Sequence, residues 1–151
     1  MNILACCLFA ALRLSVPDLP PGGFADTEVS TNIPITVSFR RMNHLVFTLD
    51  ANPTPSNSLE VAIGRDADHD GKLAVEEADF AFGADCGRWF WRSTGANRIK
   101  PAPGGRFVLN TSRNELFEGT NLVKVTRRGL VPSCGTVALK SELRGLYLFV
   151  R

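Results

Sequence analysis

Four acidic residues and one glycine stand at fixed intervals in the twelve-residue segment DADHDGKLAVEE, namely Asp66, Asp68, Asp70, Glu77 and Gly71. Alternate residues of a tightly wound loop can direct their carboxylate oxygens toward one point. The glycine permits the left-handed backbone conformation that such a tight turn requires. Hard divalent cations prefer six to eight oxygen ligands, and carboxylates supply them. The spacing therefore predicts a metal-binding loop.

The segment 66–77 resembles the calcium loop of the EF-hand family, whose pattern is D-x-[DN]-x-[DN]-G-x5-E. This resemblance implies side-chain ligation by Asp66, Asp68 and Asp70. It also implies that Lys72 contributes its backbone carbonyl oxygen and that Glu77 contributes both carboxylate oxygens. The implied cofactor is one calcium ion. The alternative is a solvated acidic turn that holds no metal.

Ala74 departs from the EF-hand pattern. It occupies the ninth loop position, where a side-chain oxygen usually holds a water molecule on the metal. Without that oxygen we expect a weak site, with a dissociation constant of ~10⁻⁴ to 10⁻³ M, as in extracellular modules. The sequence contains no second loop of this type that could pair with the first.

The residues before the loop predict a strand and not the entering helix of an EF-hand. Leu59, Val61 and Ile63 alternate with other residues at a period of two, and Gly64 disfavours a helix. We expect a strand, then the loop, then a short helical turn over 75–79. This arrangement resembles a calcium loop inserted in a β protein, or half of a dockerin-type repeat.

Short β-like runs separated by Gly, Pro and Asn turns continue along the chain and predict a mainly β fold. The expected strands cover residues 33–39, 44–49, 59–63, 80–82, 88–92, 106–109, 122–126, 136–140 and 146–150. Their number and spacing are typical of an antiparallel β-sandwich or a jelly-roll-like domain. We expect one such domain over 24–151, carrying the loop.

The first sixteen residues form an apolar segment, 1–16, that is typical in length of the core of an export signal. It lacks a preceding Lys or Arg, so a buried strand or helix in the fold is the alternative. Of the four cysteines, Cys86 and Cys134 lie outside this segment, and these two could form a disulfide in an oxidising compartment. The apolar segment and the cysteine pair both favour a secreted, periplasmic or cell-surface protein. In addition, the segment 59–89 is similar to parts of bacterial secreted or surface proteins.

The charge distribution is uneven along the chain. Residues 1–85 contain five Lys or Arg and twelve Asp or Glu, whereas residues 86–151 contain twelve and three. Such a division is compatible with a nucleic-acid surface. The basic residues are however dispersed among the expected strands and form no continuous run, which favours pairing between the two halves of one domain. No apolar run is long enough to span a membrane.

Trp89 and Trp91 flank Phe90 in an expected strand, so both indoles lie on one face. If that face is exposed, the two rings could stack on sugars, and the protein would be a carbohydrate-binding or adhesion module with a glycan or another surface protein as its partner. If it is the inner face, the rings fill the core.

The sequence does not contain a set of residues that predicts catalysis. Its two histidines are His44, at the start of an expected strand, and His69, inside the acidic loop. No nucleophile elbow, phosphate loop or zinc-protease motif is present. We therefore expect no enzyme and no catalytic residue. The expected function is calcium binding that stabilises an extracytoplasmic β module, with the glycan-binding module and a helical EF-hand sensor as alternatives.

Overall fold

A computed structural model describes residues 12–18, 20–22, 27–38, 44–50, 58–85, 87–93, 98–110, 116–129 and 136–142 of the 151-residue chain. These residues form strands and turns and contain no helix. The strands are β1 (Leu12–Leu14), β2 (Glu28–Val37), β3 (His44–Asp50), β4 (Ser58–Gly64), β5 (Ala78–Asp85), β6 (Arg88–Ser93), β7 (Arg98–Pro101), β8 (Arg106–Asn110), β9 (Gly119–Arg128) and β10 (Thr136–Glu142).

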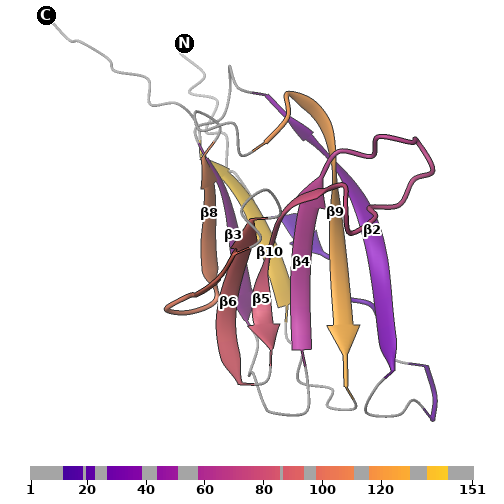
Figure 1. Ribbon diagram of the computed structural model, residues 1–151, viewed down its shortest axis with the longest axis vertical. Helices are drawn as coiled ribbons and strands as arrows, with labels where there is room; N and C mark the ends of the chain where they lie inside the picture. Colours follow the sequence, from indigo (N-terminus) through magenta and orange to yellow (C-terminus); the bar gives the residue numbers. More distant parts are fainter. Residues whose placement is uncertain are drawn as a thin grey trace, which may run out of the picture.

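The strands form two antiparallel sheets that pack face to face (Figure 1). The small sheet has the order β1-β10-β3-β8, and the large sheet has the order β2-β9-β4-β5-β6-β7. Phe82 of the large sheet contacts two rings of the small sheet, with centroid distances of 5.0 Å to Phe47 and 4.6 Å to Phe107. The predicted mainly β, antiparallel sandwich is therefore confirmed.

Period-two alternation determines which residues enter the core between the sheets. In β4, Leu59, Val61 and Ile63 face inward and are buried, while Glu60 lies on the outer face. The same alternation places Val123 and Val125 of β9 beside them in register. The outer face of the large sheet is therefore free to carry the polar residues, and it is also where the acidic loop lies.

The strand boundaries differ from the sequence prediction at several places. β2 begins at Glu28 and not at residue 33, because its polar first half pairs with β9 in continuous register. β7 was not predicted. The predicted strand at 146–150, together with Cys86 and Cys134, lies outside the described residues. In the apolar segment 1–16, Leu12–Leu14 forms β1 and pairs with β10, and Leu14 is buried. The prediction of an export signal remains a prediction.

The short helical turn expected over 75–79 is not present in the structure. Residues 75–77 form a turn in which the Glu77 N–H donates to the Ala74 carbonyl oxygen at 3.3 Å, and β5 begins at Ala78. Ala74 has no side-chain oxygen to cap a helix start. Strand pairing also resumes at once, because Ala78 is already in register with Gly64.

Candidate metal centre

The acidic loop joins β4 to β5, two neighbouring strands in the middle of the large sheet. It leaves β4 after Gly64, crosses over β9 and β2, and returns to β5 (Figure 1). A register shift occurs between Ile63 and Gly64, where the loop departs. The two ends of the loop are therefore held by strand pairing, and the loop lies on the outer face of the sheet.

Leu73, the eighth residue of the loop, anchors it to the sheet. Its side chain is 1% exposed and packs in a small apolar cluster with four other residues: Ala62, Ala78, Ala81 and Leu122. This cluster is separate from the core between the sheets. Leu73 therefore attaches the loop to the outer face of the large sheet.

Two polar contacts from neighbouring strands fix the same residue. The Leu73 N–H donates to Asn32 Oδ1 of β2 at 3.0 Å, and Lys124 Nζ of β9 donates to the Leu73 carbonyl oxygen at 3.3 Å. Both side chains are far from the loop in sequence. Sequence analysis missed them, although their outward positions on polar strands are compatible with such contacts.

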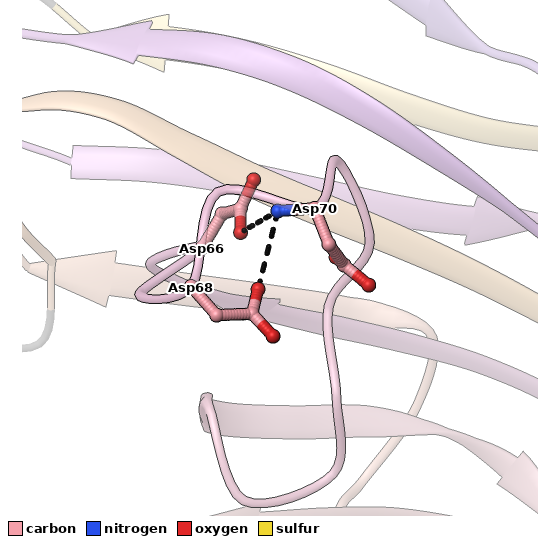
Figure 2. A group of neighbouring side chains, drawn as sticks. All are labelled: Asp66, Asp68 and Asp70. Atoms are coloured by element: carbon pink, nitrogen blue, oxygen red, sulfur yellow. Dashed lines mark hydrogen bonds between the residues drawn. The ribbon is translucent and has the colours of Figure 1, made fainter.

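Asp66, Asp68 and Asp70 come together at the turn of the loop. Each offers a carboxylate oxygen, and these three oxygens lie within 4.8 Å of one another. The Asp70 N–H points between the other two side chains, at 3.2 Å from Asp66 Oδ1 and 3.2 Å from Asp68 Oδ1 (Figure 2). Backbone donors thus hold the carboxylates in place on one side of the cluster.

The backbone of the loop turns sharply at two residues. His69 and Gly71 have φ angles of 61° and 79°, in the left-handed region. A Cβ atom on Gly71 would meet no atom within 4 Å, so the φ angle alone favours glycine there. The Gly71 N–H donates to Asp66 Oδ2 at 3.0 Å. His69 is exposed and is not one of the grouped ligands.

Glu77 closes the loop through hydrogen bonds from the backbone. Its Oε2 accepts from the Ala74 N–H at 3.0 Å, and its Oε1 accepts from the Ala67 N–H at 2.8 Å. These bonds, that from Ala74 foremost, hold the pKa of Glu77 below its ordinary value of 4.5. Among the described residues, Glu77 does not belong to the group of three converging carboxylates. Its side chain would have to turn to reach a shared metal.

The three carboxylates could hold a metal ion, and their spacing can be compared with that around calcium, the predicted metal. Oxygen ligands of Ca²⁺ lie about 2.3–2.6 Å from the ion, so ligand atoms around one ion are separated by up to about 5 Å. The 4.8 Å spread of the three aspartate oxygens satisfies this limit. Lys72 is exposed, so its charged side chain can extend into solvent. Its expected ligand atom is the backbone carbonyl oxygen.

Comparison of the chain with protein-family models, with curated protein sequences and with solved structures gives no match. The EF-hand or dockerin-like character of the loop therefore stays a prediction from its own spacing. Within the part of the chain that the structure describes, no helix has the length and apolarity needed to cross a bilayer.

Trp89 and Trp91 lie on the inner face of β6, and both are half-buried against the core. The Trp91 ring lies 5.0 Å from Phe80 and 6.3 Å from Phe82, centroid to centroid, and Trp89 lies 6.3 Å from Phe107. The residue between them, Phe90, lies on the opposite, outer face. Glycan binding by the two indoles stays a prediction, but their rings are engaged in packing between the sheets.

Proposed function

We propose that the loop 66–77 binds one calcium ion and that this ion stabilises the β-sandwich. The observation that carries the proposal is the convergence of three aspartate oxygens within 4.8 Å, in a loop that Leu73 anchors to the sheet. Asp66, Asp68 and Asp70 would bind through their side chains. Lys72 would bind through its carbonyl oxygen, and Glu77 would complete the coordination with both carboxylate oxygens.

The ion would act mainly by relieving repulsion in the loop. Three carboxylates this close together repel one another, and a divalent cation removes that repulsion while it cross-links the ends of β4 and β5. Ala74 supplies no ligand at the ninth position, so we expect a dissociation constant of ~10⁻⁴ to 10⁻³ M. At ~1 mM calcium and a constant of ~10⁻⁴ M, binding adds about 1.4 kcal/mol to the free energy of unfolding.

This affinity suits a protein that works outside the cytoplasm. A site with a millimolar or submillimolar constant fills at extracellular calcium concentrations, as in other extracellular modules. Secretion, the periplasm or the cell surface is therefore the proposed location. A regulatory sensor is less well supported, because sensors respond by reorienting helices and this loop is bordered by β4 and β5.

Calorimetric titration of calcium into the chelator-stripped protein tests the proposal. We expect saturable binding of one ion by the wild type and at least a tenfold weaker affinity in Glu77→Gln. Glu76→Gln is the matched control, because it removes the same charge from the neighbouring exposed residue and should leave the affinity within about twofold. Absence of binding by the wild type, or equal losses in the two variants, would show that the segment is an acidic turn without a specific site.

A further inference from the structure

The outer face of the large sheet contains a cavity of about 310 Å³ beside the acidic loop. Strands β2, β9, β4, β5 and β6 contribute to its lining, and loop residues 73–75 form part of its wall. Sequence analysis did not predict it, because the lining residues come from strands that are distant in the chain. The cavity is at the lower end of the 300–1,000 Å³ that small-molecule sites usually have.

The cavity exists because small residues lie between large ones in two neighbouring rows of the sheet. In one row Gly83 lies between Glu60 and Phe90, and in the next row two alanines separate Lys124 from Arg92. A Cβ atom on Gly83 would lie 2.0 Å from the Leu59 carbonyl oxygen, so the close strand approach excludes larger residues. The cavity is thus a consequence of how the strands pair.

The charged side chains that line the cavity balance one another. They are three basic and three acidic residues: Arg92, Lys124, Arg128, Glu28, Glu60 and Asp85. Glu28 accepts a hydrogen bond from Arg128. Lys124 donates to the Leu73 carbonyl oxygen. An ionic ligand would meet groups of its own sign as well as of the opposite sign, so the lining favours a neutral ligand.

Glu60 and Arg92 face each other across the floor without a direct hydrogen bond. Arg92 Nη2 lies 3.6 Å from Glu60 Oε1, which is beyond hydrogen-bond distance, and both side chains are about one third exposed, 30% for Arg92 and 34% for Glu60. A hydroxyl group of a ligand can bridge such a pair, by donating to the carboxylate and accepting from the guanidinium. Burial raises the pKa of Glu60, and the charge of Arg92 opposes this effect.

Phe90 supplies an aromatic ring to the lining. Its ring is half-buried and lies beside Gly83, in the same row as Glu60. An aromatic ring next to directed polar groups is a combination found in small-molecule sites. A compound with an apolar ring face and several hydroxyl groups on its rim satisfies both parts.

We propose that this cavity binds a neutral saccharide unit of one or two sugar rings. Phe90 would pack against the C–H face of a ring, and Glu60 with Arg92 would bind its hydroxyl groups. The site is on the opposite face of β6 from Trp89 and Trp91. It also does not need the metal, since most of its lining belongs to the strands.

Titration of neutral sugars into the full chain, with and without calcium and followed by isothermal calorimetry and by amide chemical shifts, tests this site. The probes are the methyl glycosides of glucose, galactose, mannose and xylose and the corresponding disaccharides. We expect saturable binding of at least one probe, weakened at least tenfold by Phe90→Ala and by Glu60→Gln. Phe117→Ala is the matched control, because Phe117 is an exposed aromatic residue that does not line the cavity.

Circular dichroism and thermal melting of each variant separate loss of binding from loss of fold. A variant that unfolds is replaced by the milder Phe90→Leu, which keeps an apolar side chain but removes the aromatic ring. The proposal is overturned if no neutral probe binds. It is equally overturned if binding is unchanged in folded Phe90 and Glu60 variants.

Discussion

At the scale of single residues, Gly64 shows how the loop is attached to the sheet. A Cβ atom at this position would lie 2.1 Å from the Glu77 carbonyl oxygen and 3.0 Å from the Ala78 Cα. Ala78 is paired with Gly64 in the sheet, and Glu77 directly precedes it, so this backbone has little room to move. The glycine is therefore needed for close approach of the two ends of the loop.

Gly64→Ala should lower the free energy of unfolding by about 1–3 kcal/mol, the usual cost of forced overpacking. Gly104→Ala is the control, because a Cβ atom there would meet no atom within 4 Å and the φ of Gly104 is outside the left-handed range. That change should stay within about 0.5 kcal/mol. Urea denaturation measures both, and a tolerated Gly64→Ala would contradict the close approach.

The hydrogen bonds to Glu77 also predict a dependence of stability on pH in the metal-free protein. The pKa of Glu77 is lower in the folded chain, through the Ala74 and Ala67 N–H groups, than its ordinary value of 4.5. The stabilisation is therefore present above pH 4.5 and is lost as the pH falls through the lowered pKa. In chelator, wild type should be more stable than Glu77→Gln at pH 7, and urea denaturation should show this difference shrinking toward pH 3.

A difference between wild type and Glu77→Gln that stays constant from pH 7 to pH 3 would contradict these hydrogen bonds. Glu76→Gln again serves as the control and should show no such trend. Since Glu77 is partly exposed to solvent in the structure, the expected effect is small, and its direction is the informative quantity.

At the scale of elements, the loop depends on a single apolar anchor. Leu73 is buried in the small apolar cluster that it forms with three alanines and Leu122, whereas Val75, two residues later, is 66% exposed. Leu73→Ala should lower the free energy of unfolding by about 2–5 kcal/mol. Val75→Ala should change it by about 0.5 kcal/mol or less. Urea denaturation gives both values, and similar values for the two variants would contradict the anchoring role.

Short β-like runs bounded by turn residues were sufficient to predict β3, β4 and β8, and in each strand large apolar side chains enter the core at every second position. The same criterion failed for β7 and for the first half of β2, which are polar. Both strands are at the edges of the large sheet, and the missed segments, 28–32 and 98–101, each contain a single β-branched apolar residue. An edge strand buries less apolar surface and tolerates residues such as Pro101 in β7, so its local sequence gives little strand signal.

The acidic loop was the most predictable part of the candidate site, since its spacing is local. Its attachment through Asn32 and Lys124, and the cavity beside it, depend on register between β2, β9, β4 and β5. One sequence does not reveal that register. The exiting helical turn was predicted from family resemblance, and it is absent because Ala74 lacks a capping oxygen and β5 begins directly after the turn.

At the scale of the whole molecule, the uneven charge along the chain has a counterpart in the fold. Glu60 lies next to Arg92, and Glu28 next to Arg128, so each pair joins an acidic residue of the first 85 to a basic residue of the remainder. Pairs that remain accessible to solvent contribute little stability individually, about 0–1 kcal/mol each. They do agree with the interpretation that the two halves attract one another within one fold.

The central claim is that calcium bound by the loop stabilises the whole sandwich, and thermal unfolding with and without calcium tests it most directly. At ~1 mM calcium, the expected stabilisation of about 1.4 kcal/mol corresponds to a rise in melting temperature of about 3–6 °C for a chain of this size. The rise should increase with calcium concentration, and it should be lost in Glu77→Gln and kept in Glu76→Gln. An unchanged melting temperature for the wild type, up to ~10 mM calcium, would contradict the account.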